Sequence, residues 1–139
     1  MTGLTALLGF TAWTLLLVAF YASYRVLVVL GGRAKADAWT RGKPSMDPPL
    51  VQRAHHAHLN ALENLPVFAA IVLAAVAMDR TAVVDELGRW VLYARIAQSL
   101  VHLVGVNHVL VLLRATLFVV QLLLFAYMLF QLLAGTSAG

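Results

Sequence analysis

Four polar side chains follow one another at helical spacing in a segment that is otherwise apolar. They are, in chain order, Arg53, His56, Asn60 and Glu63. At about 100° per residue they project within one arc of about 80° and climb about 15 Å along a helix. Charged groups at membrane depth are costly and mark functional sites. Two cationic donors, an amide and a carboxylate on one stripe suit an extended zwitterionic ligand.

A purely structural role is the first alternative for this stripe. Asn60 and Glu63 can hydrogen-bond neighbouring helices, with Arg95 as a buried counter-charge for Glu63. A metal site is a second alternative, because His55 and His58 have a spacing found in helical metal sites. Glu63 does not lie on the face of these histidines, so we expect no metal site.

The composition is that of a membrane protein. Of the 139 residues, 62% are hydrophobic and 12% are charged, against about 45–50% and 25% in soluble domains. The length predicts a single domain over residues 1–139. The chain has no cysteine, which excludes disulfides and thiolate catalysis by the protein itself. The net charge of +4 agrees with basic cytoplasmic loops, and we expect no nucleic-acid partner.

Apolar runs of the length that a membrane span needs, about 20 residues, occur four times. We expect spans at about 4–30, 50–78, 87–106 and 109–133. No basic residue precedes Arg25, so the first run is interpreted as a retained span and not as a cleaved signal peptide. Short connections between such helices predict an all-α, up-down-up-down transmembrane four-helix bundle.

Loop charges predict the orientation of the bundle. The first loop is the most basic, with Arg33, Lys35, Arg41 and Lys43. The positive-inside rule therefore places this loop in the cytoplasm and both termini on the opposite side.

The start of the second span resembles the MAPEG family, the membrane-associated proteins in eicosanoid and glutathione metabolism. The family pattern is Arg-Ala-x-x-Asn-x-x-Glu followed by x-x-Pro, and this chain has His56-Ala57-His58-Leu59-Asn60-Ala61-Leu62-Glu63-Asn64-Leu65-Pro66. The run Leu-Glu-Asn-Leu-Pro-Val-Phe is similar to bacterial members, which implies a bacterial inner membrane. The resemblance extends over the whole chain, with four spans and an arginine in the third.

This resemblance implies a homotrimer that binds glutathione as co-substrate between neighbouring protomers. Glu63 would receive the amino group of glutathione, Arg53 a carboxylate, and Asn60 would donate and accept hydrogen bonds. Arg114 corresponds to the arginine that activates the thiol, with Arg95 as the second candidate. Arg25 either reaches the site from the first span or anchors that span at the membrane surface.

Two positions depart from the family pattern. His56 replaces the usual arginine, and an imidazole carries its full charge only below about pH 6.5. His102 stands where several members have a tyrosine, seven residues after Arg95. Glutathione affinity is therefore expected to be weaker or pH-dependent.

Three functions remain open at this point. The first is a glutathione-dependent transferase or peroxidase for lipophilic electrophiles that arrive through the membrane lipids. The second is a non-catalytic membrane scaffold or ligand-binding protein with the same architecture. The third is a small transporter, which the clustering of polar residues near one membrane face disfavours.

Overall fold

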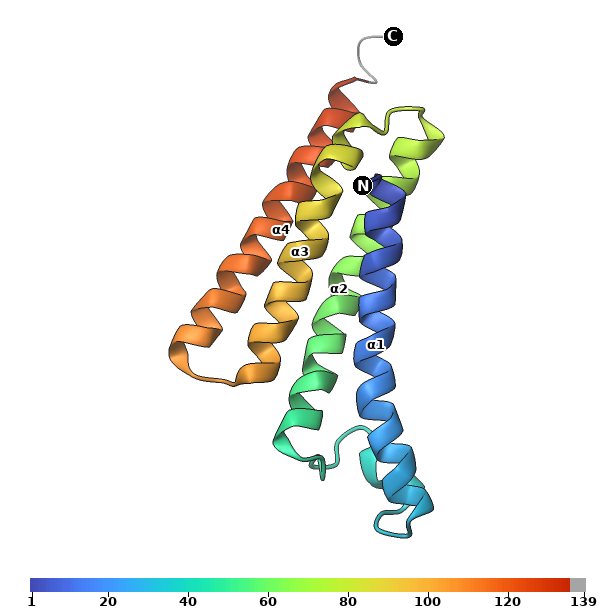
Figure 1. The fold of residues 1–139 in the computed structure, drawn as a ribbon, viewed down its shortest axis with the longest axis vertical. Coiled ribbons are helices and arrows are strands. Elements are labelled where there is room, and N and C mark those ends of the chain that lie inside the picture. The colour runs from blue at the N-terminus through green and yellow to red at the C-terminus, as the bar shows by residue number, and fades with distance from the viewer. Residues whose placement is uncertain (136–139) are drawn as a thin grey trace.

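Four long helices make up the computed structural model, which describes residues 1–135 (Figure 1). In chain order they are α1 (Gly3–Leu30), α2 (Pro49–Ala77), α3 (Ala82–Val104) and α4 (His108–Ala134), with a short 3-10 turn, η1 (Ala36–Trp39), between α1 and α2. Consecutive helices run in opposite directions, and the start of α1 and the end of α4 lie at the same end of the bundle (Figure 1). The predicted all-α, up-down-up-down bundle is confirmed.

Local sequence explains where several helices begin. The Thr2 side chain accepts a hydrogen bond from the Thr5 backbone N–H, and Asn107 caps α4 in the same way through Leu110. Such caps satisfy N–H groups that have no partner within the helix. Pro49 opens α2, as expected for a proline in the first turn of a helix.

Length and composition make three of the four helices candidates for crossing a membrane. They are α1, α2 and α4. The helix α3 has 23 residues, which is long enough, but it carries a row of polar side chains. These are Arg95, Gln98, Ser99 and His102, and all are buried against neighbouring helices. The structure thus supports an integral membrane bundle, while the crossing of α3 stays a prediction.

The helix α3 begins at Ala82, several residues before the expected start at about residue 87. Asp85, which was expected in a loop, lies in the first turn and accepts a hydrogen bond from the Gly3 backbone N–H at 2.6 Å. A carboxylate is favourable at the positive end of a helix dipole. This contact also joins the beginnings of α1 and α3.

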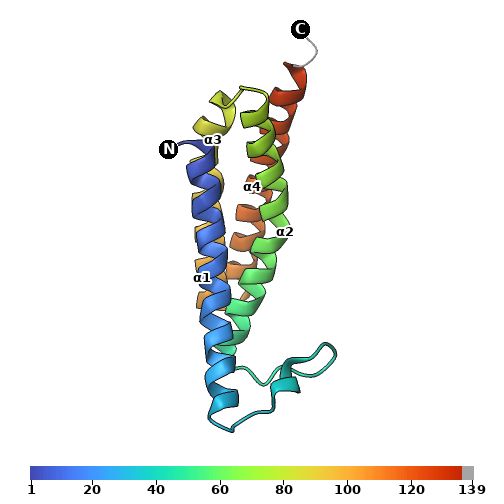
Figure 2. The ribbon, with the colours of Figure 1, turned by 90° about the vertical axis from the view of Figure 1, so that its right-hand side faces the viewer.

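The core lies where α1, α2 and α3 pack together, and α4 packs chiefly against α3. The Phe68 ring lies between Phe10 of α1 and Phe125 of α4, with ring centroids 5.9 and 5.8 Å away. Figure 2 shows α1 and α2 side by side along most of their length, with α4 behind them. Much of the outer face of α4 is exposed and apolar, which suits a surface covered by lipid or by another copy.

Candidate functional site

An open groove of about 530 Å³ lies between α2, α3 and α4. It is near the turn that joins α3 to α4, at the end of the bundle away from the termini (Figure 1). The groove is lined by His56, Asn60, Gln98, His102, Val106, Val111, Arg114, Ala115 and Phe118. Its polar side comes from α2, α3 and Arg114, and its apolar side from the α3–α4 turn and α4. It therefore offers charged and hydrophobic surface to one ligand.

Two histidines face each other across this groove. His56 projects from α2 and is exposed, whereas His102 lies in the last turn of α3 and is buried. Their ring centroids are 6.2 Å apart. His56 and His102, the two departures from the family pattern, are therefore neighbours in space.

Arg114 brings a cation with spare donors to the same groove. Its Nε atom is buried and has no hydrogen-bond partner among the described residues. A buried donor without an acceptor costs about 1–3 kcal/mol, so a ligand that accepts from Arg114 gains stability. A guanidinium also stabilises a nearby anion such as a thiolate.

Gln98 is a groove residue that the sequence analysis missed. The Gln121 amide nitrogen donates to the Gln98 side-chain oxygen at 2.8 Å, and both side chains are buried. This bond directs the oxygen of Gln98 toward α4 and leaves its amide N–H groups for a ligand. The signal was present, because Gln98 follows Arg95 by three residues and precedes His102 by four, on one helix face.

The other residues of the predicted stripe lie outside the groove. Arg53 donates through Nε to the Leu103 backbone oxygen at 2.8 Å, which caps the end of α3. Its terminal nitrogens have no partner among residues 1–135. Glu63 is exposed on α2 and forms no hydrogen bond or ion pair with the described part of the chain.

Arg95 is completely buried, at 0% exposure. Its guanidinium carbon lies 5.2 Å from the centroid of the Phe10 ring, and its Nε and Nη2 atoms have no hydrogen-bond partner within the described chain. Glu63 is close enough to interact with Arg95 electrostatically. The two side chains nevertheless form no ion pair, so the carboxylate remains available.

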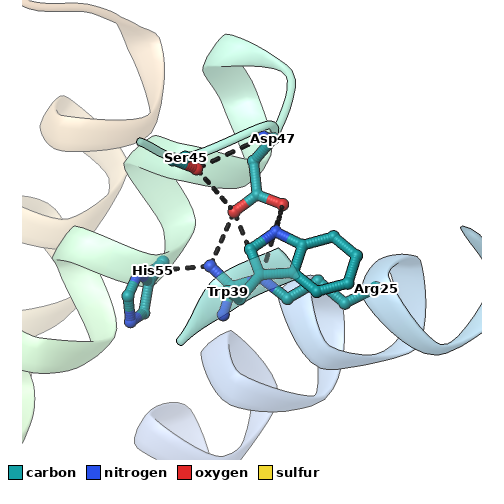
Figure 3. A network of polar contacts seen from close by, with 5 residues as sticks. All are labelled: Arg25, Trp39, Ser45, Asp47 and His55. Atoms are coloured by element: carbon teal, nitrogen blue, oxygen red, sulfur yellow. Dashed lines mark hydrogen bonds and ion pairs between the residues drawn. The ribbon is translucent and has the colours of Figure 1, made fainter. Parts of the chain in front are cut away.

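Arg25 takes part in a different cluster, drawn in Figure 3. Its Nη2 atom is 2.6 Å from the Asp47 carboxylate and 3.4 Å from Nδ1 of His55. The Trp39 indole N–H donates to Asp47 at 2.8 Å, and the Ser45 hydroxyl donates to it at 3.2 Å (Figure 3). Arg25 thus holds the first loop against α1 and does not line the groove.

The Asp47 carboxylate is the acceptor that Arg25, Trp39 and Ser45 share in this loop cluster. Its side chain is fully buried. Burial by itself raises the pKa of Asp47, but the hydrogen bonds from Arg25 and Trp39 outweigh it, and the pKa lies below its usual range. An ionised carboxylate therefore stabilises the conformation of the first loop.

The fold and the groove define a class: a small all-helical integral membrane protein with a polar groove near one end of its bundle. A MAPEG family model matches residues 3–134, so the chain belongs to the MAPEG family. The family includes glutathione transferases and peroxidases as well as non-catalytic members. Comparisons with curated proteins and with solved structures gave no match.

Proposed function

We propose that this protein is a glutathione-dependent membrane transferase or peroxidase that acts on lipophilic electrophiles. One observation carries the proposal. A groove lined by Asn60, His102 and Arg114 lies close to a carboxylate, Glu63, that forms no hydrogen bond or ion pair with residues 1–135. Glutathione is a zwitterion with one ammonium, two carboxylates and a thiol, and this set of side chains complements it.

Binding depends on charge-assisted hydrogen bonds. The Glu63 carboxylate accepts hydrogen bonds from the ammonium of glutathione. The terminal nitrogens of Arg53, which have no partner among residues 1–135, donate to a carboxylate of glutathione. Asn60 and Gln98 pair with the peptide groups, since a primary amide both donates and accepts. His56 adds a donor at the mouth of the groove.

Activation of the thiol is assigned to Arg114. The thiolate and not the thiol is the nucleophile, and a neighbouring guanidinium favours the thiolate. In transfer, the sulfur forms a bond to the electrophilic carbon as the leaving group departs. Arg95 is the second candidate for this role, although it does not line the groove. The electrophile enters from the bilayer along the apolar side of the groove.

Assembly as a homotrimer completes the proposed site. An exposed carboxylate on a helix within the bilayer costs several kcal/mol unless a partner covers it. Glu63 points outward from its own protomer, so a neighbouring copy would cover it and enclose the bound glutathione. We further propose that the protein lies in a bacterial inner membrane with the first loop in the cytoplasm.

The test is conjugation of glutathione to a generic aromatic electrophile by the purified, assembled protein. We expect turnover well above the uncatalysed rate, and a loss of about tenfold or more in kcat for Arg114→Gln. A correctly folded assembly that binds glutathione without turnover would contradict the enzymatic part of the proposal.

One observation favours a second candidate, a non-catalytic ligand-binding member of the family. His56 and His102 stand together where family members often have arginine and tyrosine. A protein of this kind would bind glutathione, or a lipophilic ligand in its place, without turnover. A pure scaffold would bind neither ligand. A measurement of glutathione affinity therefore distinguishes a glutathione-binding protein from a scaffold.

A further inference from the structure

A second cavity lies at the opposite end of the bundle from the groove. It has a volume of about 620 Å³ and opens between α3 and α4, beside the α2–α3 loop (Figure 1). Its walls include the apolar side chains of Val83, Leu87 and Leu124. The exposed rings of Trp90 and Tyr93 lie on α3 within two turns of it, and such rings mark the level of lipid headgroups.

Two opposite charges line this cavity without meeting. Arg80 donates to the backbone oxygens of Leu132 and Gln131, at 2.9 and 3.4 Å, which fixes its guanidinium over the end of α4. Glu86 is exposed and lies in the first turns of α3. Within residues 1–135, neither side chain forms an ion pair. The cavity therefore contains a guanidinium held in place by hydrogen bonds, that of Arg80, and a separate carboxylate, that of Glu86, which forms no ion pair with the described residues.

The Tyr127 hydroxyl is a third polar group in this cavity. The Gln131 amide donates to the Tyr127 hydroxyl oxygen at 2.8 Å, and both residues line the cavity. Since that oxygen already accepts a hydrogen bond, the hydroxyl hydrogen is free to donate. A phosphate accepts readily from both a guanidinium and a hydroxyl.

We propose that this cavity binds the headgroup of phosphatidylethanolamine. The phosphate lies near Arg80 and Tyr127, the ammonium donates to Glu86, and the first part of an acyl chain follows the apolar wall. The ammonium of this lipid has three N–H donors, as the lysine ammonium does, whereas the quaternary ammonium of phosphatidylcholine has none. Glu86 thus selects between two zwitterionic headgroups of the same net charge.

Glu86 and Arg80 also stabilise helix ends. The acidic Glu86 lies near the positive end of the α3 dipole, and the basic Arg80 lies near the negative end of the α4 dipole. That structural role predicts no preference among lipids. Lipid preference therefore separates a binding site from two isolated helix-end contacts.

The experiment is native mass spectrometry of the purified protein in detergent with added dioleoyl phosphatidylethanolamine, phosphatidylcholine or phosphatidylglycerol. We expect the ethanolamine lipid to bind about tenfold more tightly than the choline lipid, the size expected for losing a charge-assisted hydrogen bond. Glu86→Gln should abolish this preference. Asp79→Asn is the matched control, because it removes an exposed carboxylate from the same end of the bundle outside the cavity.

Several results would overturn the proposal. One is equal binding of the ethanolamine and choline lipids to the unmodified protein, and another is a preference that survives in Glu86→Gln. Binding of phosphatidylglycerol as tight as that of the ethanolamine lipid would mean that only the charge of Arg80 matters. Displacement of the lipid by an equal concentration of free phosphoethanolamine would assign the cavity to a soluble ligand. A thermal unfolding curve unchanged by Glu86→Gln would establish that the variant is folded.

Discussion

Glu63 and Arg95 interact electrostatically across the α2–α3 contact, but they do not form an ion pair. Arg95 is enclosed against the Phe10 ring, while Glu63 is exposed on the outer face of its helix. The buried cation therefore places a positive charge behind the carboxylate without taking its oxygens. Those oxygens remain free for an ammonium from a ligand, and this separates a binding site from an ordinary contact between helices.

Replacement of Arg114 tests the activation of the thiol. We expect Arg114→Gln to lower kcat by about tenfold or more, because the thiolate loses the cation that stabilises it. Arg114→Lys should retain part of the rate as a point charge with different geometry. The measurement is the pH dependence of kcat, whose rising limb should move to higher pH in Arg114→Gln. An unchanged pH profile would remove Arg114 from this role.

Replacement of His56 tests the departure from the family pattern. A guanidinium carries a permanent charge and five N–H donors in a planar fork that matches a carboxylate, whereas an imidazole offers at most two donors. We expect His56→Arg to raise glutathione affinity by about threefold to tenfold at pH 7.5. Calorimetric titration of glutathione into the variant and into the unmodified protein measures this difference. Weaker binding by His56→Arg would place His56 outside the ligand site.

The loop cluster of Arg25, Trp39 and Asp47 makes stability depend on pH. The pKa of Asp47 is lowered in the folded protein, so its contribution is present above the unfolded-state pKa of about 3.9. It is lost as the pH falls through the lower folded-state pKa. We expect Asp47→Asn to cost about 1–3 kcal/mol at pH 7 and much less at pH 3.

Thermal unfolding in detergent between pH 3 and pH 7 checks this prediction. Asp37→Asn is the control, because Asp37 pairs with Lys43 on the exposed surface of the same loop. Such exposed pairs contribute about 0–1 kcal/mol. Equal losses of stability in Asp47→Asn and Asp37→Asn at pH 7 would contradict a special role for Asp47.

Gly88 permits the close approach of α1 and α3. A Cβ at this position would lie 3.1 Å from the Ala6 Cβ and 3.4 Å from the Gly3 Cα. We expect Gly88→Val to destabilise the bundle by about 1–3 kcal/mol, the usual cost of overpacking. Gly105→Ala meets only the end of the Leu110 side chain, at 3.3 Å, and should have a smaller effect. A lower Tm for Gly88→Val alone would confirm the contact.

The helices could be predicted from the sequence because their signals are local. The apolar runs at about 4–30 and 50–78 coincide with α1 and α2 within a few residues. The start of α3 could not be placed, because Asp85 belongs to the helix through a hydrogen bond to Gly3, at the other end of the sequence. Contacts of that kind leave no local pattern.

The candidate site was only partly visible in the sequence for a similar reason. Helical spacing placed Arg53, His56, Asn60 and Glu63 on one stripe, but it could not say which of them would meet α3 and α4. The groove takes His56 and Asn60 from the stripe and adds Gln98, held by Gln121. Arg25 was a candidate by charge alone, and its pairing with Asp47 depends on the path of the loop.

The central claim is tested most directly by isothermal titration of glutathione into the assembled protein and into its Glu63→Gln variant. Because Glu63 is exposed and forms no ion pair with the described part of its chain, we expect the variant to fold and assemble. We expect its glutathione affinity to fall by about tenfold or more, the cost of losing a charge-assisted hydrogen bond to the ammonium. Glu86→Gln, at the opposite end of the bundle, should bind glutathione normally. Unchanged affinity in Glu63→Gln would contradict the glutathione site proposed for this protein.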